Sequence, residues 1–241
     1  MRIEVFFASA EVDEDSLRER DVVVIDVLRA STTIITALKN GAKEVIPSST
    51  IEGAVKIAQG LHPDSVLLCG EREGRRIDGF DLGNSTMEYT SDKVQGRTIV
   101  FSSTNGSVAL AKGKCAGSLV LGALVNLSEV VRFLKNSEAD ISIICAGKQN
   151  AFCLEDSICA GMVISSLLRN SSCKFNLSDS AIAAVELYKS LNTNLHQLLH
   201  DCEHGRYLTT IGFERDLDLC ANTDSVPVLP LMVDNVVRLK R

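Results

Sequence analysis

Tryptophan is absent from the 241-residue chain, and aromatic residues make up only 5% of it. This scarcity argues against a base-stacking platform for nucleic acid and against a carbohydrate-binding surface. Lysine and arginine (25) are outnumbered by aspartate and glutamate (31), so the formal net charge is −6. That sign is wrong for a protein that binds nucleic acid by broad phosphate neutralisation. We therefore expect no nucleic-acid partner.

Long apolar runs and paired cysteine motifs are missing too. No stretch reaches the roughly 18 uninterrupted apolar residues of a membrane span. The N-terminal sequence MRIEVFFASAEVDEDS turns acidic too early for a signal peptide. The eight cysteines form no C-x-x-C pair and mostly lie in apolar runs such as ISIICAG. We expect reduced thiols in a cytoplasmic protein with no membrane partner.

Short Val- and Ile-rich runs alternate with segments of helical period, which is typical of a parallel sheet covered on both faces. The sequence thus predicts an α/β fold with three layers, α/β/α, and a mostly parallel sheet. The expected strands are Ile3–Phe7, Val22–Val27, Glu44–Pro47, Ser65–Cys69, Thr98–Phe101, Ser118–Leu121 and Ile141–Cys145. The expected helices are Ala30–Lys39, Thr50–Gln59, Ser107–Lys112, Ser128–Lys135, Leu154–Arg169, Ala181–Ser190 and Leu195–Glu203, the last stopping at Gly205. Thr50 and Asn126 stand where helix caps are expected.

No linker divides the chain, so we expect a single domain over residues 1–241. Segments near 22–60 and 98–136 share strand, loop, helix, strand, loop and helix in the same order. Duplication of a βαβα unit and the common architecture of such folds explain this about equally well. The segment 178–241 is expected to be helical and to pack on the same domain. Its apolar end, VPVLPLMVDNVVRL, either completes the sheet, which we favour, or packs on a neighbour in a homo-oligomer.

Polar residues follow several expected strands, at the edge where open α/β sheets bind ligands. Carboxylates, an arginine, hydroxyls and glycine turns at one edge suit a phosphate and a divalent cation. They occur in Asp26-Val-Leu-Arg29-Ala-Ser31-Thr32, Gly70-Glu71-Arg72, Thr104-Asn105-Gly106, Ala146-Gly147-Lys148 and Glu155-Asp156.

Each of these groups also has a structural interpretation. Asp26 can cap the helix from Ala30, and Arg29 can form a salt bridge with Asp26 instead of binding an anion. For this pair we favour function, because charged residues at a buried sheet end otherwise lack a reason. Thr104-Asn105-Gly106 is equally a turn. Glu155-Asp156 is also favoured by the helix dipole.

Two further patterns resemble known sites less well. His196, His200 and His204 recur at helical spacing, but the outer two would lie roughly 12 Å apart, too far for one metal ion. We expect a polar helix face, with a two-histidine metal site as the alternative. Cys69-x5-Arg75 has the spacing of a cysteine phosphatase loop, but two glutamates inside it would repel phosphate, and we regard it as accidental.

The motifs VIDVLRASTTI, GEREGRRIDGFDLGNS, STNGS, CAGK and LEDSICAG, in this order, resemble the 2-phosphosulfolactate phosphatase family. The resemblance runs from about Ile3 to Pro227 and includes GRYLTTIGFERDLDLCA. Thr86 and Ser107 depart from the family pattern, which usually has Pro and Thr there. The resemblance implies a Mg²⁺-dependent phosphatase that converts 2-phospho-3-sulfolactate to 3-sulfolactate, a step toward coenzyme M. The matching positions are Asp26, Arg29, Ser31, Thr32, Glu71, Asp81, Asn84, Ser85, Thr104, Asn105, Gly106, Cys145, Gly147, Glu155 and Asp156.

From these positions we predict roles. Asp26, Arg29 and Asp156 are expected to be catalytic, and Mg²⁺ to be held by one or two of Asp26, Glu71, Asp81, Glu155 and Asp156. Arg29, Arg72 and Lys148 would concentrate positive charge on the substrate. The substrate-binding set is Ser31, Thr32, Arg72, Asn84, Ser85, Thr104, Asn105, Gly106, Gly147 and Lys148.

Three routes of attack remain open at this point. A water held by the metal or the carboxylate of Asp26 could attack phosphorus, and the Cys145 thiol ranks last because such a thiol is more often inert and buried. Two other functions also remain open. One is hydrolysis of another anionic 2-phospho-hydroxy acid, and the other is non-catalytic binding of an anionic metabolite.

Overall fold

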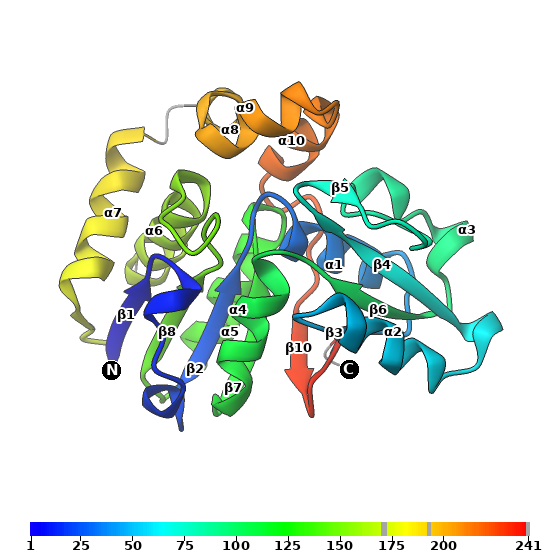
Figure 1. Cartoon of the computed structure of the whole chain (residues 1–241). Helices are drawn as coiled ribbons and strands as arrows, with labels where there is room; N and C mark the ends of the chain where they lie inside the picture. Colours follow the sequence, from blue (N-terminus) through cyan, green and yellow to red (C-terminus); the bar gives the residue numbers. More distant parts are fainter. Residues whose placement is uncertain (170–172, 192–193, 240–241) are drawn as a thin grey trace.

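A computed structural model describes residues 1–169, 173–191 and 194–239, and within them one large, mostly parallel sheet forms the centre of the protein (Figure 1). The strands are β1 (Arg2–Phe6), β2 (Asp21–Ile25), β3 (Glu44–Pro47), β4 (Val66–Arg72), β5 (Arg75–Arg76), β6 (Thr98–Ser102), β7 (Ser118–Gly122), β8 (Ile141–Cys145), β9 (Asn176–Leu177), β10 (Pro230–Val233) and β11 (Val236–Leu239). Their order across the sheet is β5-β4-β6-β3-β11-β10-β7-β2-β8-β1-β9.

All seven strands expected from the sequence are confirmed to within a few residues. β2, β6 and β8 are buried along their whole length, as strands covered on both faces must be. In β2, Val23 and Ile25 belong to one hydrophobic core, whereas Val22 and Val24 belong to a second core on the opposite face. This alternation confirms the three-layer α/β/α class.

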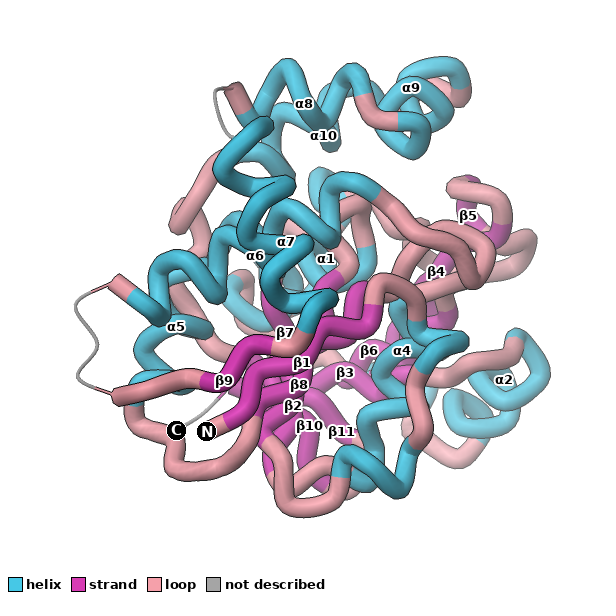
Figure 2. The backbone as a smooth tube through the Cα atoms, turned by 90° about the vertical axis from the view of Figure 1, so that its left-hand side faces the viewer, coloured by secondary structure: helices cyan, strands magenta, loops and turns pink. Residues whose placement is uncertain are grey.

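Helices cover both faces of the sheet. The helices are α1 (Ala30–Lys39), α2 (Ile51–Gln59), α3 (Ser91–Val94), α4 (Gly106–Lys112), α5 (Leu127–Lys135), α6 (Leu154–Leu168), α7 (Asp179–Leu191), α8 (Leu195–Asp201), α9 (Glu203–Thr210) and α10 (Glu214–Ala221). Figure 2 shows α5, α6 and α7 on one side of the sheet and α2 and α4 on the other.

The two expected helix caps behave differently. The hydroxyl of Thr50 accepts a hydrogen bond from the Gly53 amide at 3.0 Å and caps α2, as predicted. Asn126 stands at the start of α5 but does not cap it with its side chain, because that amide is bonded to Ala123 and Leu121. The carboxylate of Asp224 accepts from the Ser128 amide instead, at 2.7 Å.

The C-terminal residues complete the sheet, as favoured above. β10 and β11 form a hairpin that pairs antiparallel with β7 on one side and with β3 on the other. The expectation that 178–241 is helical is therefore wrong for its last part. The strands of the two similar segments pair with each other, β2 with β7 and β3 with β6. Pairing of this kind is compatible with duplication but does not establish it.

Helices α8, α9 and α10 (residues 195–221), which we call the helical roof, lie above the edge where β2 ends (Figure 1). The expected helix Leu195–Glu203 ends at Asp201, and Gly205 lies inside α9 rather than stopping a helix. Cys202 separates α8 from α9, and its sulfur accepts from the Gly205 amide at 3.2 Å. A side chain at Gly205 would collide with the Leu199 carbonyl, so the tight junction requires glycine there.

Within the described ranges, no helix has both the length and the apolar character needed to cross a bilayer. Cys69, Cys145, Cys159 and Cys220 are buried free thiols.

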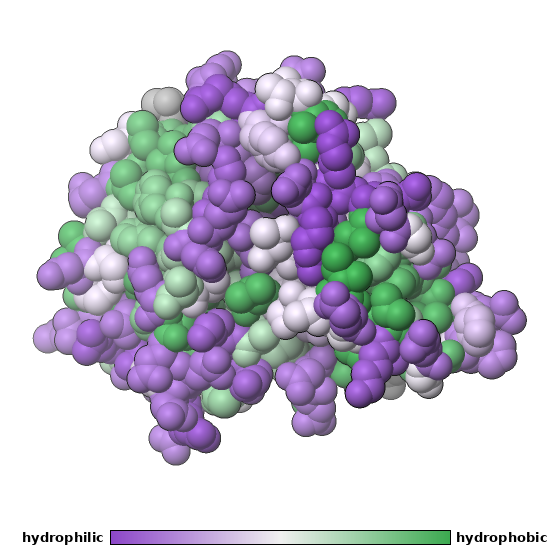
Figure 3. Space-filling view, in the orientation of Figure 1, coloured by the Kyte–Doolittle hydropathy of each residue, from purple (hydrophilic) through white to green (hydrophobic). Residues whose placement is uncertain are grey.

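Apolar side chains gather over α7 and the neighbouring N-terminal strand (Figure 3), where Ile182 is 47% exposed. Oligomerisation through this or another face stays a prediction.

The α6–α7 contact depends on Gly161, where an added methyl group would collide with the Ala184 carbonyl and lie 2.9 Å from the Tyr188 Cβ. We expect Gly161→Ala to lower the free energy of unfolding by about 1–3 kcal/mol, measured by urea denaturation. Gly60→Ala is the control, because its new methyl group meets nothing closer than 3.4 Å. Equal stability of the two variants would contradict this packing.

Candidate active site

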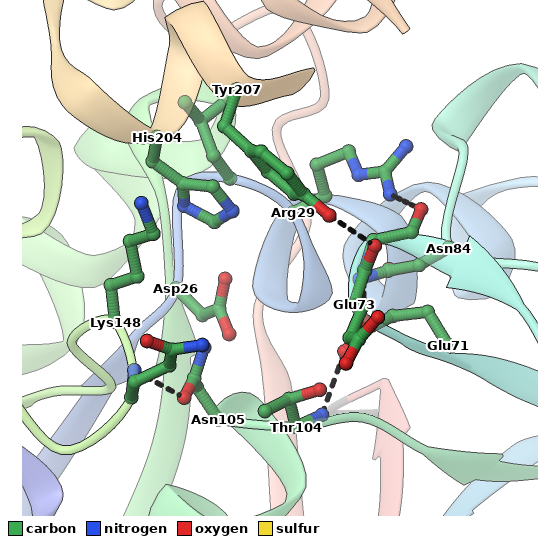
Figure 4. Close-up of a pocket in the computed structure, with 13 residues that line it drawn as sticks. Asp26, Arg29, Glu71, Glu73, Asn84, Thr104, Asn105, Lys148, His204 and Tyr207 are labelled. Atoms are coloured by element: carbon green, nitrogen blue, oxygen red, sulfur yellow. Dashed lines mark hydrogen bonds between the residues drawn. The ribbon is translucent and has the colours of Figure 1, made fainter. Parts of the chain in front are cut away.

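A cavity of about 230 Å³ lies between the helical roof and the ends of β2, β4, β6 and β8 (Figure 4). This is the sheet edge predicted from the sequence. The side chains facing it are mostly polar or charged. The lining residues are Asp26, Leu28, Arg29, Glu71, Glu73, Gly74, Asn84, Thr104, Asn105, Lys148, Gln149, His204 and Tyr207.

Asp26 is held at the point where β2 passes into α1. Its Oδ1 accepts from the Ala30 amide at 3.1 Å, so the carboxylate also caps the helix. No hydrogen bond among the described residues uses its Oδ2. Gly106 packs against this oxygen, and a methyl group there would lie 2.6 Å from Oδ2. The capping and functional interpretations of Asp26 are thus compatible, because each uses a different oxygen.

The Asp26 residue is only 6% exposed. Burial raises its pKa from the ordinary 3.8 to about 6, and the negative charges of Glu71 and Glu155 act in the same direction. The charge of His204 and the Ala30 hydrogen bond oppose this rise only in part. A cation or a hydrogen-bond donor at Oδ2 would therefore stabilise the ionised form.

Glu155 and Asp156 lie behind the cavity surface, at the start of α6. Asp156 accepts from the amides of Val27 at 2.8 Å and Gly147 at 3.2 Å, which ties the loop after β2 to the loop after β8. Burial, followed by the charges of Asp26 and Glu155, raises the pKa of Asp156 well above its usual value. Burial favours a higher pKa for Glu155, but the hydrogen bond and charge of His204, whose Nδ1 lies 3.1 Å away, act with smaller hydrogen bonds to lower the pKa overall.

Glu71 joins two other loops. Its Oε1 accepts from the Thr104 amide at 2.7 Å, and its Oε2 accepts from the Gly74 amide at 2.8 Å. Both carboxylate oxygens are therefore engaged with the main chain. The neighbouring Arg72 donates to Ser102 Oγ at 2.9 Å and is not among the lining residues.

Arg29 is buried, and it pairs with a residue far away in the sequence. Its Nη1 lies 2.7 Å from Asp216 Oδ2, its Nη2 donates to the Gly74 carbonyl at 2.6 Å, and its guanidinium stacks 4.2 Å from the centre of the Phe213 ring. The alternative of a salt bridge to Asp26 is wrong. Arg29 lines the cavity with a guanidinium whose position is fixed.

The remaining predicted residues divide into two groups. Thr104, Asn105 and Lys148 line the cavity, as does Asn84, whose buried Oδ1 has no hydrogen-bond partner among the described residues. The second group does not line the cavity. Four of its members support the loops: Ser31 and Thr32 form hydrogen bonds with the loop after β2, Ser85 donates to Asp216, and Gly147 forms a turn with φ +71°. The other two lie elsewhere: Asp81 accepts from the Leu68 amide, and Cys145 is buried in β8.

Several lining residues were missed by sequence reasoning. His204 and Tyr207 come from α9 in the roof, and Glu73 and Gly74 from the turn between β4 and β5. The polar-face interpretation is right for His196 and His200, which lie near Asp218, and wrong for His204, which turns inward. The break at Cys202 separates them. No local pattern predicts that break.

The predicted metal-binding acids do not form a compact cluster. Across the described parts of the chain, no three or more histidine, cysteine, aspartate or glutamate side chains gather closely enough to hold a metal ion by themselves. Asp81 lies outside the cavity lining, and Glu155 and Asp156 lie behind it. Asp26 and Glu71 are the two of the five predicted ligands that reach the cavity.

The fold and the cavity define an α/β protein with a polar site at its strand ends, lined by carboxylates and by the cationic side chains of Arg29 and Lys148. The family model described as 2-phosphosulpholactate phosphatase matches residues 6–235. The chain therefore belongs to the 2-phosphosulfolactate phosphatase family, and it is an enzyme of the phosphoric monoester hydrolase class.

Curated relatives align over nearly their whole length. A protein of Caldanaerobacter subterraneus subsp. tengcongensis, named "Probable 2-phosphosulfolactate phosphatase", is 38% identical, covering 99% of this chain and 98% of its own. Proteins with the same name from Thermotoga petrophila and Clostridium novyi are 41% and 35% identical. These alignments cover 92% of both chains for the first and 95% of this chain and 96% of the relative for the second.

The close approach of Gly106 to Asp26 gives one prediction. Gly106→Ala places a methyl group against Asp26 Oδ2 and Ala30 Cβ, so the carboxylate must move. We expect phosphatase activity to fall by about 10²-fold, because displacements near 1 Å at a reacting centre have effects of that size. Steady-state kinetics would measure it, with Gly60→Ala as the matched control. Unchanged activity of Gly106→Ala would show that the position of Asp26 is not critical.

The raised pKa of Asp26 gives a second prediction, for protein kept in chelator. The folded state binds the Asp26 proton more tightly than the unfolded state. The free energy of unfolding therefore falls as pH rises from about 4 to about 6, because the unfolded state loses this proton first. Asp26→Asn has no such proton to lose. The difference in the free energy of unfolding between Asp26→Asn and wild type should therefore shift by about 3 kcal/mol in favour of the variant from pH 4 to pH 6. Urea unfolding across pH tests this, and a pH-independent difference would contradict it.

Proposed function

We propose that this protein hydrolyses the phosphate ester of a small anionic 2-hydroxy acid, 2-phospho-3-sulfolactate, to 3-sulfolactate and phosphate, with Mg²⁺ as cofactor. One observation carries the proposal: a buried carboxylate, Asp26, faces a cavity at the strand ends with one oxygen free, in a chain of this family. A role in coenzyme M biosynthesis and a cytoplasmic location remain expectations from the resemblance and the composition.

Magnesium fits the residues of the cavity. Mg²⁺ usually binds one or two protein carboxylates and fills its other positions with waters and substrate phosphate, so it does not need a dedicated acidic cluster. Asp26 Oδ2 is a free carboxylate oxygen, and Asn84 Oδ1 is a buried oxygen acceptor without a partner. We assign Asp26 as the protein ligand, with Asn84 accepting from a bound water or binding directly. When bound, Mg²⁺ supplies positive charge to the phosphate group.

The protein's own cations have a separate task. The substrate would carry phosphate, carboxylate and sulfonate, while the protein has a net charge of −6. Arg29 and Lys148 are the cationic arginine and lysine side chains that line the cavity. Arg29 is held rigidly by Asp216, whereas Lys148 Nζ lies 2.8 Å from the exposed Glu203 and can exchange that partner for a substrate anion.

The main chain offers further donors. The amides of Asn105 and Gly106 make no hydrogen bond within the described residues, although Asn105 lines the cavity. The Asn105 side chain instead accepts from the Gln149 amide at 3.0 Å, which fixes the loop after β8 against the loop after β6. A phosphate oxygen seated here would be an acceptor for these amides.

Attack on phosphorus falls to a water or to Asp26. Both routes agree with a carboxylate that has one oxygen fixed and the other facing the cavity. The third route, through Cys145, loses support, because this thiol does not line the cavity. Burial and nearby carboxylates also raise its pKa well above the usual value.

Phosphate release from a panel of phosphorylated 2-hydroxy acids, with Mg²⁺ and with chelator, tests the proposal. We expect Mg²⁺-dependent turnover that is fastest with 2-phospho-3-sulfolactate, and a loss of at least about 10²-fold in Asp26→Asn. His200→Gln, altered on the outer face of the roof, is the matched control.

Preference for another 2-phospho-hydroxy acid would keep the reaction and reject the named substrate. Binding without turnover of any panel member would favour a non-catalytic metabolite binder. Near-normal turnover by Asp26→Asn would reject both roles of Asp26.

A further inference from the structure

We propose that His204 is the general acid that protonates the departing alcohol oxygen, and that Glu155 is the positioning residue that orients its imidazole. This inference rests on the proposed phosphatase function and adds a catalytic residue that the sequence motifs did not identify.

The reaction creates a need for such an acid. When the P–O bond of the ester breaks, its electron pair stays on the alcohol oxygen, and the alkoxide of a 2-hydroxy acid is strongly basic. A proton must reach that oxygen as the bond breaks. In its imidazolium form, His204 carries a proton on each ring nitrogen, and the Nε2 proton would move to the alkoxide oxygen. The attacking water forms the new P–O bond and loses a proton to solvent, and Nε2 takes up a proton from solvent before the next turnover. Atoms and charge then balance without another reactant.

His204 is placed for this transfer. It stands near the start of α9 and lines the cavity from the roof, with its ring above Asp26 in Figure 4. If phosphorus is attacked on the Asp26 side, the leaving oxygen points toward the roof. The side chain of His204 is 15% exposed, so it reaches the cavity while remaining largely packed.

Glu155 fixes which nitrogen faces the substrate. Its Oε1 lies 3.1 Å from His204 Nδ1, and the Glu155 side chain is only 2% exposed. An ionised carboxylate can only accept a hydrogen bond, so Nδ1 carries a proton and donates it to Glu155. The imidazole is thereby oriented with Nε2 as the nitrogen left for a ligand, in the same way that carboxylates orient catalytic histidines elsewhere.

Other lining groups that could donate a proton have different tasks. Tyr207 donates its hydroxyl hydrogen to the Glu73 carbonyl at 2.8 Å. Lys148, which lies beside Glu203, is assigned above to bind an anionic group of the substrate. The guanidinium of Arg29 stays protonated throughout. Asp26 below it and Glu203 on its own helix also interact electrostatically with His204.

The fold gives His204 a rigid support. Cys202 accepts from the Gly205 amide and caps α9, and Gly205 allows this turn to approach Leu199 closely. His204 lies between these two residues. The backbone of His204 is therefore fixed on both sides. A general acid needs such precise placement, because it must donate its proton to one particular substrate atom.

A pair of nearly isosteric substrates tests the role. 2-Phospholactate and 3,3,3-trifluoro-2-phospholactate differ in the acidity of the departing alcohol, and only the less acidic alcohol depends strongly on a proton donor. We expect His204→Gln to lower kcat/KM about 10²–10⁴-fold on 2-phospholactate. On the trifluoro ester, the loss in kcat/KM should be smaller by a factor of about ten or more. His200→Gln should change neither value. Equal losses of His204→Gln on both esters would overturn the general-acid role.

Glu155→Gln provides a second route if His204→Gln does not fold. It leaves the imidazole in place without its oriented partner, so we expect a smaller loss, about tenfold or more, with the same bias toward 2-phospholactate. A loss without that bias would assign Glu155 a structural role only. The two proposals fail in different ways. If the wild-type protein releases phosphate from neither ester nor from 2-phospho-3-sulfolactate, the proposed function is wrong. If the wild-type protein is active and the variant loses activity on both esters equally, only the general-acid role is wrong.

Discussion

The buried ion pair between Arg29 and Asp216 fixes the helical roof above the sheet. Arg29 ends the loop after β2 and Asp216 lies in α10, yet their side chains are 2.7 Å apart and each is 1% exposed. Asp216 also accepts from Ser85, and Arg29 also donates to the Gly74 carbonyl. Removing either charge would leave the other buried without compensation, which is strongly unfavourable. The position of His204 above Asp26 therefore depends on this pair.

The carboxylates of the site differ in how many hydrogen bonds they accept, and this difference determines which of them can bind a ligand. Glu71, Glu155 and Asp156 accept hydrogen bonds from loop amides or from His204, and in doing so they join the strand-end loops into one frame. Asp26 is compensated at one oxygen only, and burial raises its pKa. Asp26 thus faces the cavity with one carboxylate oxygen that has no hydrogen-bond partner among the described residues. A divalent cation and an anionic substrate together supply what it lacks, which agrees with a phosphatase family.

Sequence reasoning identified the features that depend on local pattern. The Val- and Ile-rich strands and the loops that follow them were predicted because burial and the strand-end rule act on neighbouring residues. Asp26, Arg29, Thr104 and Lys148 accordingly lie in the cavity. Motif matching alone did not separate residues that line the cavity from those that support it. Asp156 and Ser85 match the family pattern, but they hold the Val27 amide and Asp216.

What the sequence could not show depends on contacts between distant segments. Asp216 is 187 residues from Arg29, and nothing near either residue identifies the other as its partner. His204 shares helical spacing with His200, yet the turn at Cys202 sends the two side chains in different directions. Asp81 follows a strong motif but accepts from Leu68 outside the cavity. Only the packed tertiary structure distinguishes these cases.

We propose that Asp26, the Thr104–Gly106 loop and His204 surround one phosphate-binding site. A crystal structure with Mg²⁺ and orthophosphate, the common product of every candidate substrate, would show whether they do. We expect a phosphate ion in the cavity, with the metal on Asp26 and an oxygen of the anion facing His204. A well-ordered phosphate and metal bound elsewhere on the protein, with this cavity holding only water, would contradict it.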